Sequence, residues 1–248
     1  MPLLSHWLQQ QRNKNILFIF AHPDDEILSS GALLYWCSSH TYNVHVLILT
    51  QGEKGINLIP KTTDSLAKIR RKEFEMVMNT LRIKNATLLP FPDGNLISQV
   101  KQTTSKIKSY IIKNNIGIIA THNQDGGDGH PDHITVSRVC KELASIHKIA
   151  LLFSINPLTY KKNSRLGKNQ FQLLLSKISK KRQISLLRLY RSQISNHTLT
   201  MVMVKQLFVP FEVYQLVDVK KKLTFEYKEF QCKTYTFSPK KETEILPK

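Results

Sequence analysis

The sequence predicts an α/β fold in which helices cover both faces of a mostly parallel sheet. The first observation is that short apolar runs alternate with helical patterns through residues 1–155. The second is that the run Ile16–Ala21 is apolar throughout and rich in branched and aromatic residues, as in a strand buried on both faces. The third is that polar clusters follow the predicted strands, where open parallel sheets bind their ligands.

Strands and helices alternate along this first part of the chain. Strands are expected at Ile16–Ala21, Val44–Thr50, Ala86–Pro90, Ile116–Thr121 and Ile149–Ile155. Helices are expected at Ile27–Ser39, from a cap at Asp64 to about Arg82, at Ile97–Asn114 and at His133–His147. Pro92, Asp93 and Gly94 form a turn signal after the third strand. Because helices join the strands, we expect a parallel, Rossmann-like sheet.

The second half of the chain is less regular. We expect a polar, basic loop at Tyr160–Asn169, a helix at Lys177–Ile194 and late strands at Phe211–Val219 and Lys222–Thr236. The last ten residues include two prolines and three lysines, which is typical of a tail. The chain is therefore predicted to be a single domain with an irregular C-terminal part.

The positive charge is concentrated in the second half. Residues 1–150 carry 17 Lys/Arg and 12 Asp/Glu, whereas residues 151–248 carry 19 and 6, within a net charge of +18. Such a surface could meet nucleic acid, an anionic lipid surface or a phosphorylated substrate, or it could serve only solubility. Nucleic acid is the least favoured of these partners, because aromatic residues are only 8% and no recognition helix or zinc finger is evident.

No apolar run reaches the roughly 18–20 residues that a membrane span needs, and the N-terminal residues do not form a secretory leader. We therefore expect a cytoplasmic protein. The cysteines at 37, 140 and 232 are far apart and odd in number, so we expect reduced, buried thiols and no disulfide or metal pattern.

Two polar clusters follow the first and fourth predicted strands. The first runs from His22 to Glu26 as His-Pro-Asp-Asp-Glu, and the second runs from His130 to His133 as His-Pro-Asp-His, behind a glycine-rich loop. A catalytic divalent ion needs about three His or carboxylate ligands and an open position for water. A further carboxylate must accept a proton, and another group must stabilise the oxyanion or protonate the leaving amine. The two clusters supply all of these groups.

Other interpretations of these residues are weaker. Asp24 and Asp25 could merely cap the helix that follows them, since carboxylates favour helix N-termini. A serine hydrolase would be expected to show a G-x-S-x-G nucleophile elbow, which the sequence lacks, and no cysteine lies in a comparable cluster.

The motifs resemble those of the LmbE/PIG-L family of N-acetylglucosamine de-N-acetylases. The similar segments are A-H-P-D-D-E at 21–26, H-P-D-H at 130–133, T-Q-G-E-K-G at 50–55, Arg70 to Glu73, Pro92 to Gly94, and the stretch ending in Y-R-S-Q at 190–193. The resemblance implies a deacetylase domain over residues 14–220, followed by a C-terminal strand and basic tail over residues 221–248.

The resemblance also implies roles for individual residues. His22, Asp25 and His133 would hold a divalent metal, for which zinc is the expected ion, although Fe²⁺, Co²⁺ or Mn²⁺ also suits such ligands. Asp24 would be the general base, and His130 would stabilise the oxyanion or protonate the leaving amine as an imidazolium. Arg70 and Asp93 would contact the sugar or its aglycone.

Some positions carry competing interpretations. Arg70 could be a solvated charge, Asp93 could form an Asx turn, and Asp132 is expected to be a helix cap or a hydrogen-bond partner of the site. Asp128 stands where some relatives carry tyrosine, which leaves the oxyanion side of the site open. No role is assigned to the histidines at 45, 122 and 147.

The predicted function is metal-dependent removal of the N-acetyl group from a small molecule, glycoconjugate or glycolipid that contains N-acetylglucosamine. The expected partner is thus a small or lipid-linked amino sugar, with an anionic or membrane-surface substrate favoured by the basic second half. The alternative function is a non-catalytic carbohydrate- or nucleic-acid-binding protein on the same fold.

Overall fold

The computed structural model describes residues 3–59, 63–127, 129–155, 169–208 and 211–217. Five of the expected features lie outside these residues: Asp128, Cys232, the strand at 222–236, the tail formed by the last ten residues and nearly all of the loop at 160–169. The domain boundary after residue 220 also stays a prediction. Within the described part of the chain, no helix is both long and apolar enough to cross a membrane.

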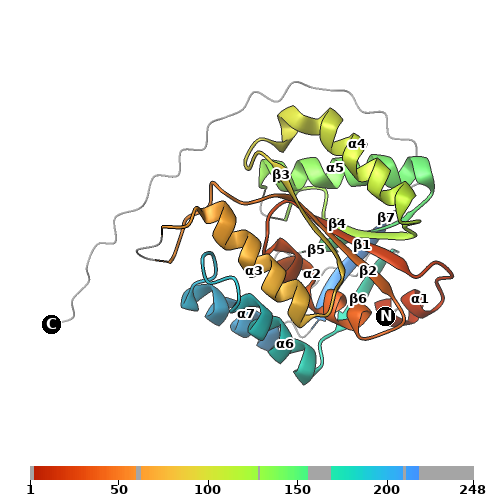
Figure 1. Cartoon of the computed structure of the whole chain (residues 1–248). Helices are drawn as coiled ribbons and strands as arrows, with labels where there is room; N and C mark the ends of the chain where they lie inside the picture. Colours follow the sequence, from red (N-terminus) through yellow and green to blue (C-terminus); the bar gives the residue numbers. More distant parts are fainter. Residues whose placement is uncertain (1–2, 60–62, 128, 156–168, 209–210, 218–248) are drawn as a thin grey trace.

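One seven-stranded sheet forms the centre of the molecule, with strand order β3-β2-β1-β4-β5-β7-β6 (Figure 1). The first five strands are parallel, and β7 pairs antiparallel with both β5 and β6. Their bounds are β1 Asn15–Phe20, β2 Asn43–Thr50, β3 Asn85–Phe91, β4 Ile118–His122, β5 Ala150–Ile155, β6 Gln170–Leu174 and β7 Phe211–Val217. The prediction of a mostly parallel sheet is confirmed, and the strand order changes direction between β1 and β4.

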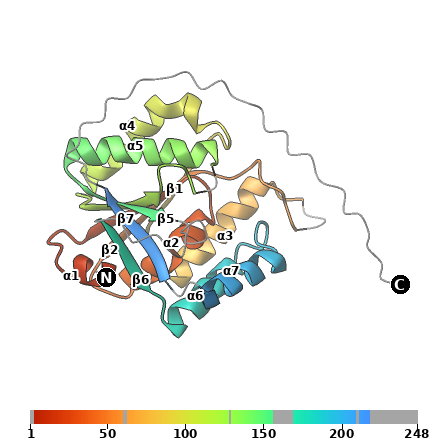
Figure 2. The ribbon, with the colours of Figure 1, turned by 180° about the vertical axis from the view of Figure 1, so that it is seen from behind.

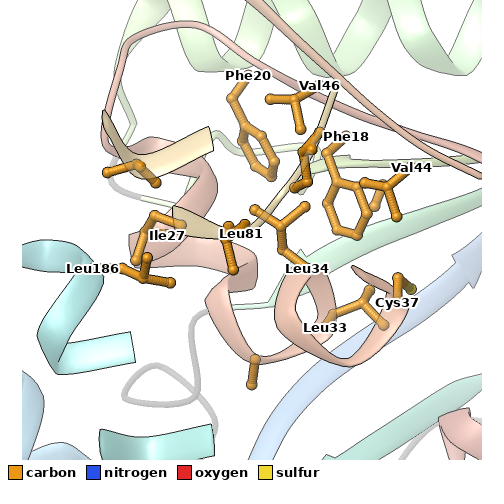
Figure 3. Close-up of a cluster of buried hydrophobic side chains, with 14 of the residues drawn as sticks. Phe18, Phe20, Ile27, Leu33, Leu34, Cys37, Val44, Val46, Leu81 and Leu186 are labelled. Atoms are coloured by element: carbon orange, nitrogen blue, oxygen red, sulfur yellow. The ribbon is translucent and has the colours of Figure 1, made fainter. Parts of the chain in front are cut away.

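Helices cover both faces of this sheet (Figure 2), as the sequence predicted. Their bounds are α1 Leu4–Gln9, α2 Asp25–Ser38, α3 Leu66–Thr80, α4 Val100–Lys113, α5 Pro131–His147, α6 Lys177–Leu187 and α7 Asn196–Phe208, with a 3₁₀ helix at Leu96–Gln99. The side chains of β1 alternate between two cores. Phe18 and Phe20 pack on the α2 side (Figure 3), whereas Leu17 and Ile19 pack on the side of α4 and α5. This alternation explains why β1 is apolar throughout.

Helix α2 is broken at Ser30, whose φ of −144° and ψ of 23° are not helical. Side chains from three other elements hydrogen-bond to the backbone groups around the break. Glu212 of β7 accepts the N–H groups of residues 32 and 33, Gln183 of α6 donates to the carbonyl of Ile27, and Ser154 of β5 donates to that of Ser29. Because buried backbone groups need partners, these bonds fix the first turn of α2 relative to the second half of the chain.

Three local predictions were wrong. The cap of α3 is Ser65, whose Oγ accepts the N–H of Lys68, while Asp64 forms ion pairs with two lysines. The helix expected to reach Ile194 ends at Leu187, because Tyr190 and Ser192 turn inward to hydrogen-bond buried carboxylates. Helices α1 and α7 and strand β6 were not predicted, and Ser195 caps the first turn of α7 through the N–H of Thr198.

Candidate active site

The two polar clusters meet because β1 and β4 are parallel neighbours. Phe18 of β1 is in register with Ala120 of β4, so the two strands end side by side. His22 and Asp25 follow β1, and His133 lies in the first turn of α5 after β4. This position is the point where the strand order reverses, which is where open α/β sheets bind ligands.

The three predicted metal ligands form a nearly equilateral triangle of donor atoms. His22 Nδ1 lies 3.2 Å from His133 Nε2 and 3.3 Å from Asp25 Oδ2, and the last two atoms are 3.3 Å apart. Bonds of about 2.0–2.1 Å to a tetrahedral ion would separate two ligand atoms by about 3.3–3.4 Å. The spacing and the donor set therefore fit a divalent ion.

Both histidines have the outer partner that metal-bound imidazoles usually have. His133 Nδ1 lies 3.1 Å from the carbonyl oxygen of Gly126, and His22 Nε2 lies 3.0 Å from Asp93 Oδ1. With these outer nitrogens protonated, His22 Nδ1 and His133 Nε2 both direct lone pairs into the triangle.

The charges around His22 also favour a cation. Burial, the largest effect, would lower the pKa of His22, but hydrogen bonds to Asp132, Asp25 and Asp93 raise it well above its usual value. Burial would raise the pKa of Asp25, yet the charge of His133 and hydrogen bonds to the histidines hold it well below its usual range. The carboxylates thus stabilise positive charge at the position that a metal would take.

Asp24 stands beside the triangle without belonging to it. Its φ of 103° is left-handed, a conformation that costs free energy for a residue other than glycine and that clusters at functional sites. Its side chain caps no helix N–H, so the capping interpretation is wrong for Asp24. Burial raises the pKa of Asp24 to about 7 against the opposing charge of Arg70, and a general base works best in that range.

Glu26 supports the turn that carries Asp24. Its carboxylate is fully buried, accepts the N–H of Asp24 at 3.0 Å, and accepts the hydroxyl of Tyr190 with its other oxygen. Burial raises the pKa of Glu26 to about 8. These contacts give Glu26 an orienting role in the turn that carries Asp24.

Arg70 is buried, so the interpretation as a solvated charge is wrong. Its guanidinium donates to the carbonyls of Pro23 and Gly52 and to Gln193 Oε1, and its Nη2 lies 3.3 Å from Asp24 Oδ1. One turn later on α3, Glu73 accepts both the N–H and the hydroxyl of Ser192. Ser192 and Gln193 of the late Ser-Gln motif therefore bind to two residues of α3, one of which, Arg70, lies beside Asp24. A contact between Arg70 and substrate stays a prediction.

Asp93 and Asp132 lie on the other side of His22. Asp93 Oδ2 accepts the N–H of Lys54, and its other oxygen faces His22, so the carboxylate reaches across two loops and not into its own turn. Burial would raise the pKa of Asp93, but the hydrogen bond and charge of His22 lower it to about 2. Asp132 accepts the N–H groups of Gly94 and Leu96 and lies 3.4 Å from His22 Nε2, as expected of a hydrogen-bond partner of the site.

His130 is the N-cap of α5 and faces the same cluster. Its Nδ1 accepts the N–H of Asp132 at 3.2 Å, so the other nitrogen carries the ring proton. Its ring centroid lies 4.8 Å from those of both His22 and His133. This arrangement suits a hydrogen-bond donor beside the predicted metal ligands.

Sequence reasoning missed His122, the last residue of β4. Its ring stacks on His133 with centroids 3.9 Å apart, and its Nε2 lies 3.5 Å from Asp25 Oδ2. Burial lowers the pKa of His122 to about 4, so the ring is neutral and can pack against a ligand. Its position one residue beyond the predicted strand end was the signal that could have identified it.

Comparisons with known proteins agree with this geometry. The model of the PIG-L family, described as GlcNAc-PI de-N-acetylase, matches residues 17–144. A 1D-myo-inositol 2-acetamido-2-deoxy-alpha-D-glucopyranoside deacetylase of Catenulispora acidiphila is 24% identical over 157 residues, which cover 54% of this chain and 49% of that protein. A probable N-acetylglucosaminyl-phosphatidylinositol de-N-acetylase of Schizosaccharomyces pombe is 30% identical over 128 residues, which cover 49% of this chain and 48% of that protein.

The fold is also that of a solved deacetylase structure. The zinc-inhibited form of the teicoplanin deacetylase Orf2 aligns with a TM-score of 0.65 and 16% identity, over 82% of this chain and 97% of that one. The chain spans about half the length of the curated relatives it matches. Since the family model covers more than half of its residues and both family motifs converge on one site, the chain belongs to the PIG-L family.

Proposed function

We propose that this protein is a metal-dependent hydrolase that removes the N-acetyl group from a small molecule, glycoconjugate or glycolipid containing N-acetylglucosamine. The observation that carries the proposal is the triangle of His22 Nδ1, Asp25 Oδ2 and His133 Nε2 beside a buried carboxylate, Asp24. We infer zinc as the ion, because two imidazoles and one carboxylate are a frequent catalytic zinc set.

The chemistry divides among the residues of the site. A divalent ion held by the triangle supplies a Lewis acid for the amide carbonyl and for the attacking water. Asp24 accepts the proton of that water and passes it to the nitrogen as the C–N bond breaks, while the Nε2–H of His130 donates a hydrogen bond to the reacting amide group. The water oxygen stays on the acyl carbon, so the products are a carboxylate and an amine.

Location and substrate charge follow from weaker observations. Cys37 and Cys140 are buried, free thiols, which supports a reducing compartment such as the cytoplasm. Residues 169–208 carry seven Lys/Arg and no Asp/Glu, which supports an anionic or membrane-surface substrate. Nucleic acid remains the less favoured partner.

The proposal is tested by measuring acetate release on a panel of conjugates, together with metal content. GlcNAc-malate and GlcNAc-phosphatidylinositol form the anionic or lipid-like arm, and GlcNAc-inositol and N,N'-diacetylchitobiose form the neutral arm. We expect release that is abolished by a chelator and restored by Zn²⁺, with faster turnover in the anionic arm. Bound metal without turnover on any conjugate would instead favour the non-catalytic binding protein.

Replacing Arg70 by Lys tests whether this residue positions the base. The lysine keeps the charge but cannot span Pro23, Gly52 and Gln193 at once, which would leave buried acceptors unpaired at about 1–3 kcal/mol each. We expect kcat to fall about 10–100-fold, as for the loss of a group that orients an active-site residue. The melting temperature should fall by several degrees.

The matched control for Arg70 is its neighbour. Arg71→Lys makes the same substitution at the next residue of α3, which is half-buried, and should leave kcat within about twofold. A rise in KM for Arg70→Lys with kcat unchanged would show that Arg70 binds substrate and does not position Asp24.

A further inference from the structure

A cavity of about 240 Å³ opens beside the metal ligands. Asp25, His122 and His133 form part of its wall, so it reaches the proposed reaction centre directly. Asp24, Arg70, Asp93 and His130 are not part of this wall. The described site therefore has two sides: a polar side with the base and the hydrogen-bond donor, and the cavity.

Five apolar side chains line the wall away from the ligands. They come from α2, β5, the segment before α6, α7 and β7, namely Leu28, Ile155, Leu175, Val202 and Phe211. Helix α6 packs against α2, and α7 packs against α6. Both helices lie on the face of the sheet opposite α4 and α5 (Figures 1 and 2).

The polar residues in the wall away from the ligands are already hydrogen-bonded within the protein. Gln206 donates to Gln183, Gln183 donates to the carbonyl of Ile27, and Glu212 accepts two backbone N–H groups and the hydroxyl of Tyr214. Asn123 Oδ1, which has no partner among the described residues, directly follows His122 at the reacting end. An occupant of the deeper part therefore needs no polar groups.

The amide that reacts at the metal has two substituents. Its nitrogen carries the sugar and must face Asp24, which delivers its proton, and the N–H of His130, so its acyl carbon points to the other side. We propose, on the basis of the proposed function, that the cavity is an acyl pocket and that the substrate amide carries a chain longer than acetyl. A water occupies about 30 Å³ and a methylene is of similar size, so the cavity has room for roughly six to eight such groups.

The hydrolysis is unchanged in its atoms. Water oxygen bonds to the acyl carbon, the C–N bond breaks, and the nitrogen takes a proton, giving glucosamine and a short fatty acid where acetate was expected. Each methylene that enters an apolar pocket favours binding by about fourfold.

The experiment uses N-acetyl-, N-butanoyl- and N-hexanoylglucosamine. Their equilibrium binding to the zinc-loaded Asp24→Asn variant is measured by calorimetry, and carboxylate release is measured with the native protein. We expect affinity and kcat/KM to rise by about fourfold per methylene up to hexanoyl.

Two variants of one helix identify the cavity as the cause. Val202→Phe fills the cavity and should lower the ratio of hexanoyl to acetyl affinity about tenfold or more, because two or more methylenes lose their place. Val204→Phe makes the same change on the solvent side of α7, where Val204 is 41% exposed, and should leave the ratio unchanged. Val202→Ala enlarges the cavity and should move the preference toward octanoyl, which gives a result even when Val202→Phe does not fold.

Acetyl preferred over butanoyl and hexanoyl in both binding and turnover would overturn the acyl pocket while leaving the proposed hydrolase intact. Equal effects of Val202→Phe and Val204→Phe would also overturn it. Failure of the proposed function is a separate result: no carboxylate released from any acyl chain by the metal-loaded protein, and no turnover on the conjugate panel.

Discussion

Replacing Asp24 by Asn is expected to lower kcat/KM by about 10²–10⁴-fold, the usual contribution of a general base. The metal content should not change, because the nearly equilateral triangle of donor atoms does not include Asp24. Asparagine has the same shape as aspartate and can still contact Arg70, but its amide cannot accept the proton of the attacking water. Kinetics on the best conjugate of the panel, with metal analysis of the same samples, checks both parts.

A carboxylate far from the site serves as the control. Asp64→Asn makes the same change at a residue that pairs with Lys68 and Lys72, and it should leave kcat/KM within about twofold. Retention of more than about a tenth of the native kcat/KM by Asp24→Asn would contradict the role of Asp24 as base.

Replacing His133 by Ala is expected to remove both metal and activity. The triangle loses one of three donors, and metal sites already lose about 10–100-fold in affinity when only an outer partner is changed. We therefore expect little metal after gel filtration and no turnover above background. The same result is expected for His22→Ala, and metal analysis with a fluorescent zinc titration checks both.

Variants of two other histidines provide a control for this test and distinguish the alternative ligand group. His147→Ala removes a histidine from the opposite end of α5 and should leave the metal content unchanged. His122→Ala removes the ring that stacks on His133, so it should weaken zinc binding by about 10–100-fold without abolishing it. Complete loss of metal in His122→Ala together with retention in His22→Ala would reassign the site to the alternative group of Asp25, His122 and His133.

The environment of Asp24, the proposed general base, depends on residues far along the chain. On α3, Arg70 hydrogen-bonds to Gln193 and Glu73 hydrogen-bonds to Ser192, while Glu26 accepts the hydroxyl of Tyr190. These three late residues lie beyond residue 144, where the match to the family model ends. Because each contact buries a charged or polar group, removing one partner would leave the other unpaired. The stretch from 190 to 193 is thus part of the support of the active site.

Most of the sheet could be predicted from local patterns. Strand β1 is apolar on both faces because it lies between two cores, and the residues of this one strand are enough to indicate that environment. The end of α6 and the start of α7 could not be predicted in this way. Tyr190 and Ser192 leave the helix to reach Glu26 and Glu73, and no local pattern reports partners that are more than 100 residues away.

The sequence alone determined which chemical groups are present: two clusters of His and carboxylate groups, each after an apolar strand, which predict a metal site at one edge of a sheet. The tertiary structure alone decided how that chemistry is divided. It placed three donor atoms at nearly equal spacing and placed Asp24 next to Arg70, outside that triangle. It also stacked His122 on His133 and formed a cavity beside Asp25 and His133. The physical reason is that residue types and their spacing are local properties, whereas distances, burial and cavities arise only when distant segments pack together.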